Sequence, residues 1–354
     1  MRIAFSVAPV ACVLVLAACG DPPASAQNDL SAVADLHMHA LEDLSTPDDE
    51  GDPGDLTPVP GPSRLSESGL YADIAQKTLA PDVIRYRPRY ELWSDGAEKD
   101  RFLRLPPNAQ IDTSQMDDWV FPVGTAVWKE FRIGGKRIET RLLQKVYPNP
   151  GGWYEIAFLW DEAEAEATAV PKGQKAARGT THDVPDVEAC GKCHGNVADV
   201  LLGVSAIQLS TANGKGLLSE LAAMGKLTNP PAGEFQPPGA GPVQDALGYL
   251  HGNCGSCHNR VSIFATAVEL KLRLSVSDMR PEDTDTYRTS IKIPLKHIFP
   301  PDVRIAVVPG DPTHSQLYRR MGVRDDWAMP NTCTKVVDAA GMALVGAWIN
   351  GLPR

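Results

Sequence analysis

The sequence predicts an α+β, multidomain fold, in which a β-rich, sandwich-like N-terminal domain precedes mostly α-helical domains. Three observations predict this fold class. Residues 66–185 hold alternating apolar runs that are separated by turn residues, which is typical of β-strands. Two Cys-x-x-Cys-His motifs follow, at residues 190–194 and 254–258. Residues 242–354 begin and end with apolar-striped segments that carry helix-capping residues.

The composition is that of a globular protein with an acidic surface. The chain has 354 residues, enough for two or three domains, and 43% of them are hydrophobic. The formal net charge is −10 at pH 7, so nothing here indicates binding to nucleic acid. An acidic surface instead favours a basic protein partner.

The N-terminal residues 1–18 have the pattern of a signal peptide. Arg2 precedes an apolar run, which ends in Leu-Ala-Ala directly before Cys19. This junction resembles a bacterial lipobox, which implies cleavage before Cys19 and lipid on that residue; an unmodified Cys19 is the alternative. Residues 19–65 are rich in Pro, Gly and Asp and predict a disordered tether. We therefore expect a lipid-anchored protein on the periplasmic side of the bacterial cell envelope.

Residues 66–185 form the predicted β-rich domain. Two alternating runs flank Gly134-Gly135, which predicts a hairpin, and residues 153–160 predict a third strand after a turn. Five of the seven tryptophans fall in this domain. A binding platform is one interpretation of them, but the core of a β-sandwich is favoured.

The two Cys-x-x-Cys-His motifs indicate covalent attachment of haem. Two thiols on one turn reach the two vinyl groups of haem, and the adjacent histidine reaches the iron. Zinc is an alternative, but the 60 residues between Cys193 and Cys254 exceed the roughly 15–20 of a zinc ribbon. A disulfide or a chance pattern is the simplest alternative. We expect two covalently bound haem c groups, with thioethers at Cys190, Cys193, Cys254 and Cys257 and with His194 and His258 on the irons.

The chain around these motifs predicts helices. Residues 186–241 carry the first motif, a helical stretch and a Pro- and Gly-rich linker. Residues 242–354 predict a cytochrome c-like domain, with a helix from Pro242, a second from Pro312 and a last one after Asp338. The alternation of residues 268–276 predicts a β-hairpin insertion between these helices.

Eight segments carry a resemblance to a known family over residues 65–354. They are LSESGLY (65–71), YELWSDGAEKDRFLRLP (90–106), WVFPVGTAVWKEF (119–131), IETRLL (138–143), ACGKCH, YLHGNCGSCHN, VVPGDPTHSQLYRRM and WINGLP. The chain resembles a family of secreted dihaem c-type cytochromes of poorly known role. The resemblance implies haem binding and electron transfer, without an established substrate. The family's usual Met-Pro-Pro before the last helix is here Met329-Pro330-Asn331.

The sixth iron ligands are predicted from loop position. Met329 lies in a non-helical stretch before the last helix, and we expect it on the second haem. Met321, on the predicted helix from Pro312, fits core packing better. For the first haem the sequence leaves three candidates, Met224, His182 and His251, with Met224 ranked first.

Two functions follow from this pattern. The first is an electron-transfer protein that carries electrons between a periplasmic donor and an acceptor, both unidentified. The second is a peroxidase-like haem enzyme that works at an open coordination position of the first haem.

Overall fold

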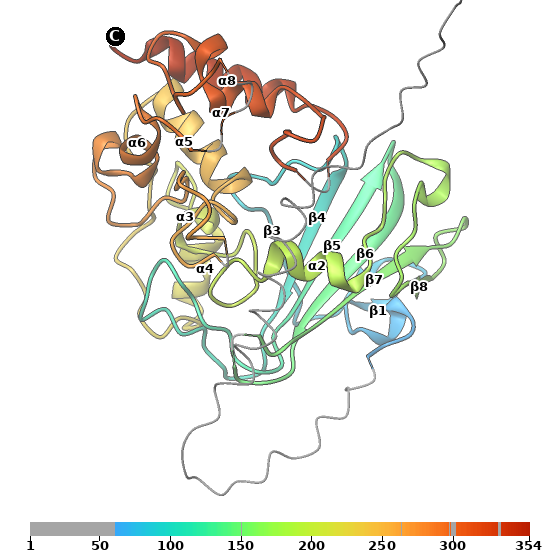
Figure 1. Ribbon diagram of the computed structural model, residues 1–354. Coiled ribbons are helices and arrows are strands. Elements are labelled where there is room, and N and C mark those ends of the chain that lie inside the picture. Colours follow the sequence, from blue (N-terminus) through green and yellow to red (C-terminus); the bar gives the residue numbers. More distant parts are fainter. Residues whose placement is uncertain (1–60, 150, 263, 297, 299–301, 332–333) are drawn as a thin grey trace, which may run out of the picture. The chain divides into compact units, whose positions relative to one another are not determined.

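The computed structural model describes residues 61–149, 151–262, 264–296, 298, 302–331 and 334–354 (Figure 1). The predicted signal peptide, the predicted lipidated Cys19 and residues 19–60 of the predicted tether lie outside the described residues. The end of the predicted tether is described, and there Leu65 is fully buried.

A six-stranded antiparallel sheet organises the first half of the described chain. Its strands follow one another in sequence order, and each one pairs with the next along the chain. The strands are β3 (Ile84–Tyr86), β4 (Glu98–Arg104), β5 (Ala126–Ile133), β6 (Lys136–Lys145), β7 (Trp153–Trp160) and β8 (Ala167–Ala169). The hairpin predicted at Gly134-Gly135 is confirmed, because β5 and β6 pair on either side of it and both glycines have a positive φ.

The prediction of a sandwich is wrong. Besides the six-stranded sheet, the described residues hold only a two-stranded sheet of β1 (Tyr71–Asp73) and β2 (Thr78–Leu79). One face of the large sheet buries Trp128 and Trp160 against the segment around Leu65 and Leu70. The other face packs against helical and irregular chain from residues 200–227. Trp119, Trp128 and Trp160 are core residues as expected, whereas Trp93 and Trp153 are only partly buried. Helices and loops take the place of a second sheet.

The helices are short, and most of them follow the sheet in the sequence. The α-helices are α2 (Val187–His194), α3 (Ala206–Leu209), α4 (Leu217–Ala223), α5 (Pro242–Asn253), α6 (Asp285–Ser290), α7 (Gln316–Met321) and α8 (Ala339–Gly351). Short 3₁₀ turns occur at η1 (Leu65–Glu67), η2 (Ala177–Gly179), η3 (Pro281–Asp283) and η4 (Pro312–His314). Pro242 at the start of α5 and the Asp338 cap of α8 are confirmed.

Residues 242–354 do not form the predicted mostly helical, cytochrome c-type domain. Their four α-helices have 12, 6, 6 and 13 residues, so most of the segment lies outside α-helices. The helix predicted from Pro312 is a 3₁₀ turn that ends at His314, and α7 begins two residues later. The sequence marked the starts of α5 and α8 correctly, but not that of α7, and the chain between the helices is irregular.

The β-hairpin predicted over residues 268–276 is absent from the described residues. The segment is extended, and its alternation buries Leu272 and Leu274 while its polar neighbours are more exposed. Its backbone bonds go to the second motif rather than to a neighbouring strand: the Leu272 N–H donates to the carbonyl of His258 at 2.7 Å. The alternating pattern of residues 268–276 therefore predicted correctly that one side of the segment is buried, but its prediction of strand pairing is wrong.

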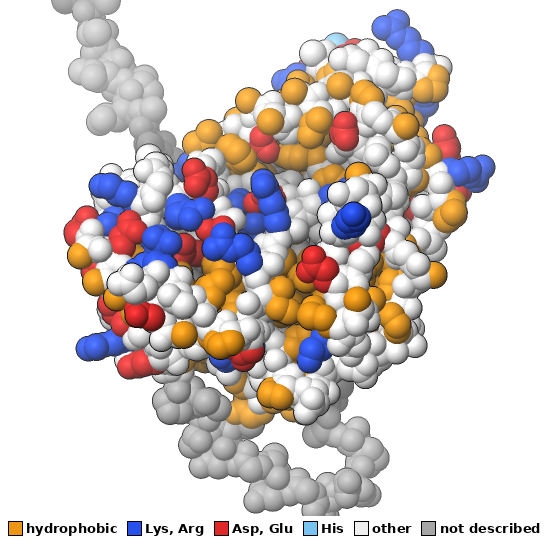
Figure 2. All heavy atoms as spheres, turned by 180° about the vertical axis from the view of Figure 1, so that it is seen from behind, with side chains coloured by type: hydrophobic (Ala, Val, Ile, Leu, Met, Phe, Trp, Pro, Cys, Tyr) orange, Lys and Arg blue, Asp and Glu red, His pale blue; other side chains and the backbone are white. Residues whose placement is uncertain are grey.

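Residues Pro60–Arg354 form one compact unit. A hydrophobic cluster joins Ile207, Leu247 and Leu274, and so connects the α3 region to α5 and to the extended segment. On the face drawn in Figure 2, Lys and Arg side chains are interspersed with Asp and Glu side chains. No described helix is long and apolar enough to span a bilayer.

Candidate functional site

The first Cys-x-x-Cys-His motif forms the C-terminal part of α2, which contacts β7 of the sheet (Figure 1). Asp186 caps this helix, because its carboxylate accepts a hydrogen bond from the Ala189 N–H at 2.7 Å. Residues four apart lie on the same side of a helix, so Cys190 and His194 share one face, and Cys193 adjoins the histidine. The motif therefore presents two thiols and one imidazole together.

The second motif begins where α5 ends. Cys254 is the C-cap of this helix, and a tight turn follows in which the N–H of His258 donates to the carbonyl of Cys254 at 2.9 Å. Burial raises the pKa of the Cys254 thiol to about 12, and Cys257 adds to the shift. The Cys254 thiol is therefore protonated at neutral pH.

Both motif histidines are held in the same tautomer. Nδ1 of His194 lies 2.7 Å from the carbonyl oxygen of Val200, and Nδ1 of His258 lies 3.1 Å from that of Leu270. A carbonyl oxygen only accepts, so Nδ1 carries the proton in each ring and Nε2 keeps its lone pair. Burial lowers both pKa values to about 4, so both rings are neutral at pH 7. This is the form and the support that a metal-binding histidine requires.

The loop after α2 that holds His194 is strained and firmly anchored. Val200 has φ 65°, a conformation that is rare and costly for a β-branched residue. The preceding residue, Asp199, forms a fully buried ion pair with Lys145 of β6 at 2.7 Å. Asp199 also accepts hydrogen bonds from the indole N–H of Trp153 and from the backbone N–H of Phe121. These contacts hold the loop against the sheet, and the Val200 carbonyl in this loop orients His194.

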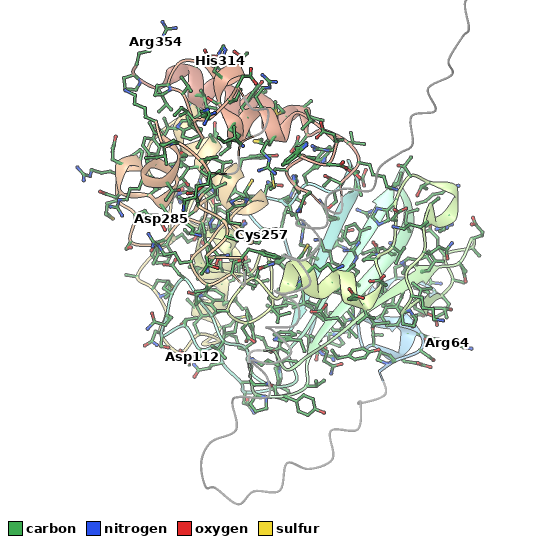
Figure 3. The ribbon with its side chains drawn as sticks, in the orientation of Figure 1. Arg64, Asp112, Cys257, Asp285, His314 and Arg354 are labelled. Atoms are coloured by element: carbon green, nitrogen blue, oxygen red, sulfur yellow. The ribbon has the colours of Figure 1, made fainter. Side chains whose placement is uncertain are left out.

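The chain just after the first motif contacts the second motif, although 60 residues lie between Cys193 and Cys254. Asn196 is fully buried two residues after the first motif, and its side-chain N–H₂ lies 3.8 Å from the sulfur of Cys257. Its side-chain oxygen accepts from the hydroxyl of Ser262 at 2.7 Å, and its backbone carbonyl accepts from Asn259 at 3.0 Å. Figure 3 shows Cys257 in the region between α5 and α2. Among the described residues, no three His, Cys, Asp or Glu side chains form a group that could hold a metal ion.

Met329 lies next to the second motif. It lines a pocket of about 380 Å³, including space open to solvent, to which Cys254 also contributes. Met321 borders the same pocket, but only 8% of it is exposed and it belongs to the core between α5 and α8. The structure thus brings the predicted ligand Met329 to the second motif, and places Met321 in the core as expected.

Met224 is in a poor position for an iron ligand. It is the C-cap of α4, and 48% of its surface is exposed. The neighbouring Gly225 accepts a hydrogen bond from Gln110, which places this helix end at the loop between β4 and β5. Exposure of this kind fits a surface methionine better than a sulfur held on iron.

The two histidine candidates for the first iron are engaged elsewhere. Nε2 of His182 lies 2.6 Å from a carboxylate oxygen of Glu139, and its ring packs on Phe131. Nδ1 of His251 accepts the N–H of Leu274 at 3.0 Å, so its Nε2 carries the proton. Burial lowers the pKa of His251 to about 3, which keeps this ring neutral. His251 is therefore a hydrogen-bond donor rather than a lone-pair donor in this arrangement.

A cationic row that the sequence analysis missed crosses the sheet on the face that carries α2. It consists of Lys99, Arg101, Lys129 and Arg141, which lie on one face because Arg101 pairs with Lys129 and Lys129 with Arg141 in the strand register. Arg101 and Lys129 line a pocket of about 810 Å³, including space open to solvent, together with the loop after His194. Each strand taken alone contributes only one or two residues to the row. The period-two spacing of Lys99 and Arg101 was visible in the sequence. The strand register that aligns them with Lys129 and Arg141 was not, because a single sequence does not contain it.

No protein-family model, no curated protein and no solved structure matches this chain.

Proposed function

We propose that this protein is an extracytoplasmic dihaem c-type cytochrome that passes electrons between a donor and an acceptor protein. The observation that carries the proposal is the shared state of His194 and His258. Each ring is neutral, donates Nδ1–H to a backbone carbonyl and keeps a lone pair on Nε2 beside two cysteines. Two unrelated structural histidines have no reason to share this arrangement at two identical motifs.

The residues present fit haem c at both motifs. Cys190 and Cys193, and likewise Cys254 and Cys257, would hold the porphyrin through thioethers, with His194 and His258 on the irons. Met329 would be the sixth ligand at the second motif, where it shares a pocket with Cys254. Haem iron, when bound, supplies one-electron chemistry, and Met/His ligation raises its reduction potential. The protein's own part is to hold ligands, exclude water and set the local charge.

The contact between the motifs supports exchange of electrons within one chain. Asn196 comes two residues after the first motif, and its side-chain N–H₂ lies 3.8 Å from the sulfur of Cys257 in the second motif. Asn196, Asn259 and Ser262 are nearly inaccessible to solvent, so the bridge is rigid and dry. Two cofactors attached at these motifs would therefore be neighbours, as an electron relay requires.

The location belongs to the same proposal, because covalent haem attachment and the lipobox-like junction both indicate export. We propose that lipid on Cys19 holds the protein at a membrane of the bacterial envelope. Cys19→Ser should release the haem-loaded protein into the soluble fraction. If the variant stays with the membranes, the proposed anchor is wrong.

Haem counting tests the main proposal. The purified protein should contain two haems per chain by pyridine haemochrome, and each double Cys→Ser variant, at Cys190/Cys193 or at Cys254/Cys257, should contain one. Lys192→Ala, inside the first motif at an exposed side chain, is the matched control and should keep two. A wild-type protein without haem but with stoichiometric zinc would contradict the proposal and support the zinc interpretation.

A second candidate function, a peroxidase-like enzyme, is favoured by one observation. Met224 is half-exposed, and neither His182 nor His251 offers a free Nε2 lone pair, so none of the three candidates is ready to close the first iron's sixth position. Electron paramagnetic resonance of the ferric protein separates the two functions. A high-spin signal with peroxide turnover would favour the enzyme, whereas two low-spin haems would favour the carrier.

A further inference from the structure

The cationic row places four like charges side by side. Arg101 of β4 lies directly across from Lys129 of β5, which lies directly across from Arg141 of β6. Lys99 is two residues from Arg101 and therefore on the same face. Opposed side chains on one face are roughly 5 Å apart at Cβ, and like charges so placed destabilise a sheet. Such a row calls for anions to balance it.

The nearby protein carboxylates balance only half of the row. Arg101 pairs with Glu91 at 2.8 Å, and Arg141 pairs with Glu139 at 2.5 Å. Lys99 instead donates to two neutral acceptors, the carbonyl of Leu92 and, at 3.3 Å, the hydroxyl of Ser94. A third carboxylate, Asp338, acts on Lys99 only through space and caps α8.

Lys129 has the least compensated charge of the row. Its ammonium lies over the Phe131 ring at 5.2 Å, and among the described residues it has no hydrogen-bond or ion-pair partner. Burial, and then repulsion from Arg101, Lys99 and Arg141, lower its pKa well below the usual value. A desolvated ammonium without a counter-ion is costly. Two of the four cations, Lys99 and Lys129, thus lack a bonded carboxylate.

The row is close to the first motif. Arg101 and Lys129 line a pocket whose other walls include residues 197–199 and 201–205 of the loop that orients His194. Gly255 and Ser256 of the second motif line the same pocket. A cofactor held by His194 and its two cysteines would therefore lie in the field of this row.

We propose that the cationic row binds the two propionate carboxylates of the haem attached at Cys190 and Cys193. The assignment rests on the proposed dihaem function. The proposed ligand carries two carboxylates. Lys99 and Lys129 are the two cations of the row that lack a bonded carboxylate, so they match the two propionates in number. A dicarboxylate from solution has the same chemistry, and the test separates the two sources. Haem is favoured because the row shares a pocket with the loop that orients His194, and the cofactor brings its carboxylates with it.

Lys129→Gln in the haem-loaded protein tests the assignment, with Lys99→Gln as an independent second variant. Both should keep two haems per chain, while the reduction potential of one haem moves to a more negative value, because a cation favours the reduced state. The shift should persist in protein that also carries Cys254→Ser/Cys257→Ser, and so retains only the first haem. Lys129→Arg should restore the wild-type potential. Lys136→Gln is the matched control, an exposed lysine of the same sheet, and should shift neither haem.

Three outcomes overturn the assignment. In the first, Lys129→Gln and Lys99→Gln keep two haems and move neither potential. In the second, added succinate shifts the wild-type potential but not that of Lys129→Gln, which shows that the row takes a solution anion. In the third, the wild-type protein contains fewer than two haems; the haemochrome count alone then shows that the proposed function itself has failed.

Discussion

Two methionines near the second motif have different surroundings, although only eight positions separate them. Both line the pocket of Cys254, but Met321 is buried in the core with residues such as Leu250 and Trp348, whereas Met329 is only partly buried and outside that core. If haem is bound as we propose, Met329→Ala should therefore remove the long-wavelength absorption band of a methionine-bound ferric haem and lower the potential of the haem at the second motif. Visible spectroscopy and a redox titration measure both effects.

Met321→Ala is the matched control for this prediction. It should leave the band in place and lower the free energy of unfolding by about 2–5 kcal/mol, because it removes a buried side chain. Loss of the band in Met321→Ala, with the band intact in Met329→Ala, would reverse the assignment. Loss in neither variant would point to a ligand other than methionine.

A second residue-scale prediction concerns Glu155, whose pKa burial raises to about 7. The folded protein then binds more protons than the unfolded chain between about pH 4.5 and 7, so the free energy of unfolding falls as pH rises through this range. Above pH 7 the charged Glu155 costs on the order of 3 kcal/mol, at about 1.4 kcal/mol per pKa unit.

Glu155→Gln should remove this penalty. The gain in unfolding free energy relative to wild type should grow from pH 5 to pH 7 and be constant above that, as measured by denaturant unfolding across pH. Other titrating groups are common to both proteins and cancel in the difference. A gain that does not depend on pH would show that Glu155 is not buried in its charged form.

At the scale of elements, the loop after α2 depends on the sheet for its shape. Asp199 fastens it through Lys145, Trp153 and Phe121, and the next residue, Val200, supplies the carbonyl that holds His194. Asp199→Ala leaves the Lys145 ammonium buried without a partner. The free energy of unfolding should fall by about 3–5 kcal/mol, as is usual when one member of a buried pair is removed.

If haem is attached at the first motif as we propose, the same variant should also change its potential. Without its anchor the strained Val200 can relax, and His194 then loses the acceptor that makes it a stronger ligand, so the potential of the first haem should rise. Glu98→Gln is the control, because Glu98 is exposed and lies 3.7 Å from Arg132 on the same sheet, so losing this pair should cost less than about 1 kcal/mol. Equal losses in the two variants would show that the Asp199 anchor is unimportant.

At the scale of the whole molecule, the chain around the second motif is packed onto the segment before β4. A Cβ added at Gly248 of α5 would lie 2.1 Å from the ring of Tyr90, and Asn253 accepts the backbone N–H of Trp93 at 2.7 Å. Gly248→Ala should therefore lower the free energy of unfolding by about 1–3 kcal/mol, despite the better helix propensity of alanine.

Gly351→Ala gives the comparison for Gly248→Ala, because no atom lies within 4 Å of an added Cβ at that helical glycine. It should be neutral or slightly stabilising in the same denaturant titration. A neutral Gly248→Ala would mean that Tyr90 moves freely, and that α5 and the sheet side are not tightly coupled.

Local features of this protein were predictable from its sequence. The β5–β6 hairpin follows from Gly134-Gly135, and the starts of α5 and α8 follow from Pro242 and Asp338. Each depends on a few neighbouring residues, whose conformational preferences act over one turn. The two Cys-x-x-Cys-His motifs are local in the same way, because thiols and imidazole are adjacent along the chain.

Tertiary structure alone decided how these pieces combine. The contact of Asn196 with Cys257, the alignment of Lys129 with Arg101 and Arg141, and the pocket of Met329 join residues that are far apart in sequence. Tertiary packing also decided that there is a single large sheet and that irregular chain stands where helices were expected. Both follow from which segments cover each face of that sheet. Strand register and long-range packing depend on the whole set of contacts at once, and residue spacing in one chain does not encode them separately.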